Sequence, residues 1–212
     1  MGRWEPNARA RLEQAAMELF QELGYTRTTV EGIAARAGLT ERTFFRYFTD
    51  KREVLFSGSA NLEKLIIEAI EEAPKTTAPL DSVASALEAT TPIFEERRAY
   101  ARKRRAVIAA HAELRERELI KLASLAGAAA ASLRKRGVAA PTADLAAEAG
   151  IAVFRNGFER WVDDKLQRPL SAHMQAALKE LRAVTAGTGS SSPRRRTTNT
   201  SRRKRTRTQR SV

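Results

Sequence analysis

The sequence contains no cysteine among its 212 residues. This absence excludes disulfide bonds, thiolate zinc sites and a cysteine nucleophile. The only histidines, His111 and His173, fall in different predicted helices and lack metal-ligand spacing, so we expect neither a metal nor another cofactor. No apolar run approaches the ~20 residues that span a bilayer, and the N-terminal segment is polar. We therefore expect a cytoplasmic protein that does not bind a membrane.

Glycine, proline and strand-forming patterns are also scarce. Long stretches are rich in Ala, Leu, Glu and Arg, and they lack the Val/Ile/Thr alternation of strands. This composition predicts an all-α protein, and hydrophobic residues, which make up 42% of the chain, are numerous enough to form a core. The sequence shows no phosphate loop, nucleophile elbow or convincing acid–base pair, so we do not expect an enzyme.

Positive charge is concentrated in one segment. The formal net charge is +13, but residues 187–212 carry nine Lys or Arg residues and no acid, which leaves +4 for the rest of the chain. Such a segment cannot support a packed core, so we expect a disordered basic tail. The tail would bind duplex DNA without sequence preference and increase the salt dependence of binding. Alternatively, it only keeps the protein soluble.

Four short helices are expected at the N-terminus, at about 8–23, 30–37, 41–48 and 50–73. Their apolar residues recur at three- and four-residue steps. Gly24 and Gly38 are typical residues to end the first two helices. Threonines at 28–29 and at 40 are good N-caps, and Asp50 with Glu53 forms a capping-box pattern that opens the fourth helix.

A larger helical unit follows the segment PKTTAP at residues 74–79. Its helices are expected at about 80–95, 97–110, 113–136, 142–167 and 170–185, because glycine and proline interrupt the pattern between them. About nine helices are therefore expected. The predicted domains are a three-helix helix-turn-helix domain at residues 1–50, a larger C-terminal helical bundle at 51–186 and the tail at 187–212.

The segment TERTFFRYFTDK at residues 40–51 carries four aromatic residues in a chain with only 6% of them. Two short helices joined at Gly38, with a third behind them, predict a helix-turn-helix. Helical spacing predicts that Phe44 and Phe48 face the core. The opposite face then presents groups suited to base edges: Thr40, Glu41, Arg42, Thr43, Phe45 and Arg46. The alternative is an ordinary small helical bundle with a few exposed arginines.

Two segments, ARLEQAAMELFQELGY and TTVEGIAARAGLTERTFFRYFTDKREVLF, carry a family resemblance. Residues 10–56 resemble the DNA-binding domain of the TetR family of transcriptional regulators. The resemblance implies phosphate contacts from Thr28, Thr29, Tyr47 and Lys51, and contacts to bases or nearby phosphates from Thr40, Arg42, Thr43 and Arg46. Phe45 stands where the family commonly has a tyrosine, so an apolar contact to a thymine methyl or a sugar is expected in place of a phosphate hydrogen bond.

The larger unit is expected to provide dimerisation and ligand binding. Its helices at about 142–167 and 170–185 expose more apolar surface than one subunit covers, and the resemblance implies a homodimer that forms there. It also implies a cavity for an unidentified small-molecule effector. Candidate lining residues are Phe94, Tyr100, His111, Phe154, Phe158 and Trp161. The alternatives are ordinary core or dimer interface for the aromatic residues and a partly buried structural role for His111.

A charged run at residues 95–105, EERRAYARKRR, is interpreted as a solvated helix face with internal ion pairs. The alternative is that it flanks the DNA-binding domain. Together these features predict a homodimeric, sequence-specific DNA-binding repressor that reads a pseudo-palindrome with half-sites about 10 bp apart. An effector would release it by a population shift. The alternative function is that of a nucleoid-type protein that coats DNA or RNA through the basic tail.

Overall fold

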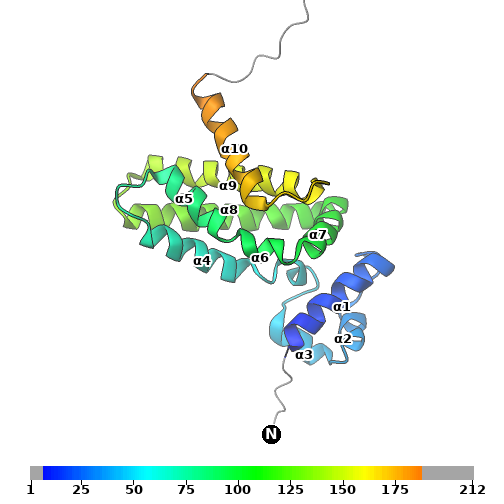
Figure 1. Cartoon of the computed structure of the whole chain (residues 1–212). Coiled ribbons are helices and arrows are strands. Elements are labelled where there is room, and N and C mark those ends of the chain that lie inside the picture. The colour runs from blue at the N-terminus through cyan, green and yellow to red at the C-terminus, as the bar shows by residue number, and fades with distance from the viewer. Residues whose placement is uncertain (1–6, 188–212) are drawn as a thin grey trace, which may run out of the picture.

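A computed structural model of the protein describes residues 7–187 (Figure 1). Within that range the chain is helical, so the prediction of an all-α fold is confirmed. The helices are α1 (Ala8–Glu22), α2 (Val30–Arg36), α3 (Glu41–Tyr47), the 3-10 helix η1 (Glu53–Phe56), α4 (Ser59–Glu72), α5 (Pro79–Ala89), α6 (Thr91–Glu95), α7 (Arg98–Ala110), α8 (Ala112–Lys135), α9 (Ala140–Asp163) and α10 (Leu170–Thr185).

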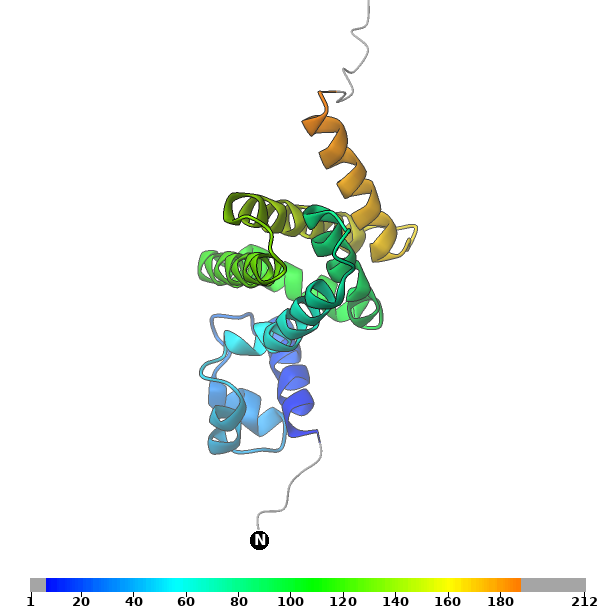
Figure 2. The same cartoon turned by 90° about the vertical axis from the view of Figure 1, so that its left-hand side faces the viewer.

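Two units are stacked along the molecule. Helices α1–α3 form a small unit at one end, and α4–α9 form a bundle next to it (Figures 1 and 2). Helix α10 packs on α9 and leans outward on the side away from α1–α3. The described chain therefore ends far from the two short helices that carry the predicted DNA contacts.

A first hydrophobic cluster holds the small unit together. The side chains of Leu12, Ile33 and Phe44 are fully buried in it. The cluster extends beyond residue 50 into η1, and it includes Ile108 of α7 and Leu114 of α8. The two units thus share part of one core, while the domain limit at residue 50 stays a prediction.

A second cluster forms the core of the larger unit, with α9 at its centre. Helix α9 packs against α5, α8 and α10. Two of its residues are glycines because these neighbours come very close: a Cβ atom at Gly150 would overlap Val83, and one at Gly157 would lie 2.9 Å from Cγ of Met174. The alanine-rich part of α8 packs against the same core.

Several helix limits differ from those expected. The helix expected at 80–95 is divided into α5 and α6 at Thr90, whose buried hydroxyl donates to the Leu87 carbonyl at 2.6 Å before Pro92. Asp50 caps a turn instead of a long helix, because its carboxylate accepts from the amides of Arg52 and Glu53 at 2.7 and 3.2 Å. The short helix η1 then precedes α4.

The helix expected to reach residue 167 ends at Asp163, and Asp164 organises the turn that follows. Its side chain is 6% exposed. It accepts hydrogen bonds from Nε of Arg168 at 2.9 Å, from Nε2 of His173 at 3.0 Å and from two backbone amides. The bond from Arg168 outweighs the effect of burial and holds the pKa of Asp164 well below its usual value. This network fixes how α10 leaves α9.

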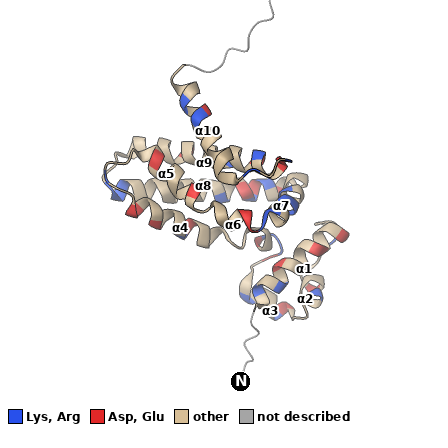
Figure 3. Ribbon diagram, in the orientation of Figure 1, with Lys and Arg blue, Asp and Glu red and all other residues tan. Residues whose placement is uncertain are grey.

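Helix α7 is rich in Lys and Arg (Figure 3). Arg98 donates to the Asp164 carbonyl at 2.9 Å, Arg102 donates to the Val162 carbonyl at 3.1 Å, and Arg105 pairs with Asp163 at 2.8 Å. These arginines therefore bind the C-terminal end of α9, where positive charge is favourable. The expected ion pairs within this run are therefore not seen for these three residues, whose partners lie on α9 and the turn after it, while Arg102 is exposed as expected.

Candidate DNA-contact surface

Helices α2 and α3 each begin at a threonine that caps them. The Thr29 hydroxyl accepts from the Gly32 amide at 3.0 Å, and the Thr40 hydroxyl accepts from the Thr43 amide at 3.2 Å. Such bonds satisfy amides that have no partner within the helix. In the turn between the helices, Gly38 adopts a φ of +64°, which glycine tolerates without strain. Both caps confirm the sequence prediction.

Helix α3 has one buried and one exposed face, as its spacing predicts. Phe44 and Phe48 are 0% and 4% exposed, and their ring centroids lie 5.4 Å apart. Phe45 is 54% exposed. The remaining predicted residues of the outer face are exposed as well, namely Thr40, Glu41, Arg42 and Arg46, while Thr43 is half-buried. The expected orientation of the helix is therefore confirmed, whereas the DNA contacts of these residues stay predictions.

Arg46 and Tyr47 form a pair at the end of α3. The Arg46 guanidinium donates to the Tyr47 hydroxyl at 3.3 Å and lies 5.0 Å from the centre of its ring. A guanidinium beside a phenol hydroxyl provides two kinds of donor for a phosphate oxygen. The pair thus has the chemistry that a DNA backbone contact requires.

The two threonines before α2 differ in exposure. Thr29 is exposed, and its hydroxyl can donate outward while it accepts from Gly32. Thr28 is 2% exposed, its hydroxyl donates to the Gly24 carbonyl at 2.9 Å, and its amide donates to the Tyr25 carbonyl. The phosphate contact expected from Thr28 therefore does not fit this structure, because its side chain faces the protein interior.

Lys51 also binds within the protein. It lies in the turn before η1, and its ammonium donates to the carbonyls of Tyr25, Thr26 and Thr28 at 2.8, 3.3 and 2.9 Å. We call these three acceptors the carbonyl cradle. An ammonium has three N–H donors, so the cradle can use all of them. The expected phosphate contact from a helix-four lysine does not fit this arrangement.

Charge in the small unit is balanced. Residues 7–57 contain eight Lys or Arg and seven Asp or Glu residues, a net charge of +1. Several cations are already in ion pairs, including Arg36 with Glu22 at 2.8 Å and Arg52 with Asp50 at 2.6 Å. Because nonspecific DNA affinity follows the number of phosphates neutralised, this unit supplies little of it.

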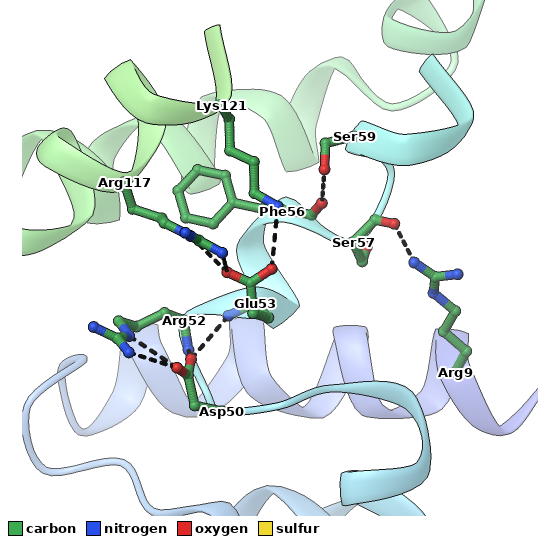
Figure 4. Close-up of polar contacts among 9 residues, drawn as sticks. All are labelled: Arg9, Asp50, Arg52, Glu53, Phe56, Ser57, Ser59, Arg117 and Lys121. Carbon is green, nitrogen blue, oxygen red and sulfur yellow. Dashed lines mark hydrogen bonds and ion pairs between the residues drawn. The ribbon is translucent and has the colours of Figure 1, made fainter. Parts of the chain in front are cut away.

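Polar contacts join the small unit to α8 (Figure 4). The Glu53 carboxylate on η1 pairs with Arg117 at 2.7 Å and with Lys121 at 3.3 Å. The capping-box role expected of Glu53 is therefore not seen, since its side chain points to α8. A buried acid, Glu13 of α1, accepts from the Ser57 hydroxyl at 2.7 Å and pairs with Arg97 at 3.3 Å. Sequence reasoning missed these pairs, because no local pattern relates residues so far apart in the chain.

The six candidate ligand-binding residues form two separate groups. Four aromatic rings meet in the larger unit at centroid distances of 5.5–5.8 Å, those of Phe94, Phe154, Phe158 and Trp161. Tyr100 packs against the cluster of the small unit, and His111 lies against Tyr25. The structure therefore places the six residues in two groups and does not gather them in one cluster.

Two hollows among the described residues lie elsewhere. One is a groove of about 190 Å³ between α9 and α10, lined by residues that include Val153, Leu181 and Val184. The other lies between α1 and α2 and is lined largely by polar and charged residues. Neither is lined by any of the four clustered aromatic residues.

Residues 7–187 offer neither a cluster of metal ligands nor a membrane-spanning helix. They contain no group of three His, Cys, Asp or Glu side chains that could hold a metal ion. None of their helices is long and apolar enough to cross a membrane.

Comparisons with known proteins agree with this geometry. Residues 13–57 match the sequence model of the family described as bacterial regulatory proteins, tetR family. The HTH-type transcriptional regulator TcmR of Streptomyces glaucescens is 37% identical over 81 residues, which are 38% of this chain and 36% of that protein. The chain thus matches about a third of the length of this relative.

Solved structures share the fold over most of the chain. A TetR-family regulator from Syntrophomonas wolfei has a TM-score of 0.61 at 20% identity, covering 85% of this chain and 96% of that one. SmeT of Stenotrophomonas maltophilia, solved in complex with triclosan, has a TM-score of 0.57 at 21% identity, covering 84% and 90%. Both likenesses show the arrangement of helices.

Proposed function

We propose that the chain is a sequence-specific repressor of the TetR family of bacterial regulatory proteins and that it binds operator DNA as a homodimer. The match of residues 13–57 to the model of that family and the similarity to TcmR support the proposal. The observation that carries the proposal is the division of α3 into two faces. Phe44 and Phe48 anchor it in the core, and Arg42, Phe45 and Arg46 are exposed.

Base reading is assigned to the outer face of α3. Arg42 and Arg46 can donate two hydrogen bonds to a guanine edge, and Glu41 can accept from a cytosine amino group. Phe45 has no hydroxyl, so it contacts a thymine methyl or a sugar. Thr40 and Thr43 lie at the margin of this face and contact bases or adjacent phosphates.

Backbone contacts are assigned to Thr29 and to the Arg46–Tyr47 pair. The Thr29 hydroxyl lies at the N-terminus of α2, where the helix dipole favours an anion. Thr28 and Lys51 support this surface from behind, since both bind the loop that leads into α2. Their role is to position the contacts and not to make them.

Dimerisation is assigned to α9 and α10. These helices expose Leu145 and Val184 at 73% and 70%, and the groove between them is lined mainly by apolar atoms. Burial of such surface favours association. Light scattering during size-exclusion chromatography should report twice the mass of the chain, and a monomer at micromolar concentration would contradict this assignment.

Release by a small effector is part of the same proposal. SmeT is solved with triclosan bound, and this chain shares its fold. In this protein the four clustered aromatic residues of the larger unit are the candidate contacts for an apolar ligand. The effector would shift the population toward a state that binds the operator poorly.

The test is a comparison of specific and random DNA with an Arg42→Ala variant. If Arg42 makes a bidentate base contact, its loss should weaken operator binding by about 1–3 kcal/mol and leave binding to random duplex nearly unchanged. Fluorescence anisotropy on both duplexes measures the two affinities. An equal loss on both would refute the base-reading role.

The alternative function, a nucleoid-type protein, rests on the basic tail at 187–212. Residues 188–212 lie outside the described residues, and the nearly neutral small unit is the observation that favours an additional source of positive charge. Deletion of residues 188–212 should then flatten the salt dependence of DNA binding. Protection of one discrete palindromic site in footprinting would argue against this alternative.

A further inference from the structure

The junction of α7 and α8 is inserted into the core of the small unit. A single residue, His111, separates the two helices, with an extended backbone at φ −127° and ψ 121°. On either side, Ile108 and Leu114 are 2% and 0% exposed and belong to the hydrophobic cluster of α1–α3. We call residues 108–114 the elbow. It belongs to the larger unit, and its apolar side chains are buried in the smaller one.

His111 contacts one aromatic residue of the small unit. Its ring lies 5.0 Å from the ring of Tyr25, at an interplanar angle of 49°. Tyr25 is 3% exposed, and burial raises its pKa to about 12, so its hydroxyl stays protonated. Phe20 of α1 contacts the same ring at 5.2 Å. The elbow and α1 therefore hold the tyrosine ring in place together.

Tyr25 in turn positions Lys51. The ammonium lies 4.4 Å from the centre of the Tyr25 ring, close enough for a cation–π interaction. It also donates to the three carbonyls of the cradle, one of which belongs to Tyr25 itself. Burial lowers the pKa of Lys51, as expected for an ammonium that has lost part of its hydration. Displacement of the tyrosine ring would therefore disturb the lysine and the loop it binds.

The carbonyl cradle ends where α2 begins. Its last acceptor belongs to Thr28, and the next residue, Thr29, is the N-cap of α2. The Thr28 amide donates to the Tyr25 carbonyl at 3.3 Å, so the loop is also closed by its own backbone. The Thr29 hydroxyl is a group assigned above to a DNA phosphate. The contacts from His111 through Tyr25 and Lys51 thus lead from the elbow to the DNA-contact surface.

We propose that His111 is a positioning residue for DNA binding: its ring holds Tyr25 and Lys51, and through them the loop that presents Thr29 and the start of α2. This inference rests on the proposed DNA-binding function and adds the route by which the larger unit acts on it. A shift of the elbow would loosen the loop and weaken the backbone contacts, without any change in the base-reading residues of α3.

The first experiment measures the order of the loop at residues 25–28 and the start of α2 in the absence of DNA. Hydrogen exchange of the full-length protein is measured without DNA for His111→Ala and for His111→Phe, which keeps an aromatic ring. The control is Glu116→Ala, a change at an exposed residue two positions beyond the elbow. In His111→Ala the amides of residues 25–32 should exchange about three- to tenfold faster, the factor that an aromatic pair is worth. In His111→Phe and in Glu116→Ala they should exchange as in the wild type.

Operator affinity provides the second measurement. His111→Ala should bind operator DNA about three- to tenfold more weakly, and His111→Phe should restore most of the affinity. Unchanged exchange in His111→Ala, or equal acceleration in the alanine and phenylalanine variants, would overturn the inference. If the wild-type protein binds no operator, the proposed function fails, while the exchange experiment still decides whether His111 holds the loop.

Discussion

Two adjacent aromatic residues on α3, Phe44 and Phe45, should respond very differently to substitution by alanine. Phe44 is fully buried, so Phe44→Ala should destabilise the protein by about 3–5 kcal/mol. At about 2–4 °C per kcal/mol for a chain of this size, the thermal midpoint should fall by roughly 6–20 °C. Phe45 is 54% exposed, so Phe45→Ala should cost about 1 kcal/mol or less.

DNA affinity should distinguish the two residues further. About half of the Phe45 ring is free to be buried against DNA, which is worth about 1 kcal/mol, or about fivefold in affinity. Phe45→Ala should therefore bind operator more weakly while it unfolds almost as the wild type does. Thermal unfolding by circular dichroism and anisotropy with a labelled operator measure both effects. If Phe45→Ala is as destabilising as Phe44→Ala, the helix is rotated relative to our description and the argument about its faces is refuted.

Three further predictions concern stability. Glu53→Gln leaves the partly exposed cations Arg117 and Lys121 without their anion, so it should lower the free energy of unfolding in urea by about 1–2 kcal/mol. The control, Glu116→Gln at an exposed residue, should leave it unchanged. Equal losses in the two variants would show that Glu53 does not join the units. Gly38→Ala should lower the free energy of unfolding by about 1–2 kcal/mol, because φ is +64° and the new Cβ would lie 2.8 Å from the Arg11 side chain. In Gly58→Ala the new Cβ meets no atom within 4 Å, so this variant should be neutral or slightly stabilising. Similar thermal midpoints for the two variants would contradict the strained turn. The pKa of Asp164 is lower in the folded state, so this carboxylate stabilises the fold above the unfolded pKa of about 3.9, and the stabilisation is lost as the pH falls toward the folded pKa. Between pH 7 and pH 2 the thermal midpoint should therefore fall less in Asp164→Asn than in the wild type. Identical profiles of thermal midpoint against pH would rule this out.

Local signals predicted the small unit well. The positions of Phe44 and Phe48 follow from helical spacing, and the caps at Thr29 and Thr40 follow from the preference of threonine for helix N-termini. These features depend on residues within one turn of each other. Such short-range causes are visible in a single sequence.

Contacts between distant segments could not be predicted in the same way. Nothing near Lys51 in the sequence shows that its ammonium reaches the loop at residues 25–28. Likewise, the spacing around His111 fits a pocket residue as well as an elbow residue. The packing of α7 and α8 against α1 decides between these roles, and that packing is a tertiary property.

Helix α9 illustrates both situations. Its apolar spacing predicted a long helix, but its end depends on Asp164, which binds a histidine nine residues later in α10. Arginines of α7, from another part of the chain, also donate hydrogen bonds to backbone carbonyls at this end. Their charge was evident from the sequence, while their partners were not.

The central claim, that α3 reads DNA sequence, is tested most directly by selecting bound fragments from genomic DNA with the purified full-length protein. The selected fragments should share a short pseudo-palindrome with half-sites about 10 bp apart. The Arg42→Ala variant should no longer enrich that sequence. Fragments without a common sequence, or the same enrichment by the Arg42→Ala variant, would contradict it.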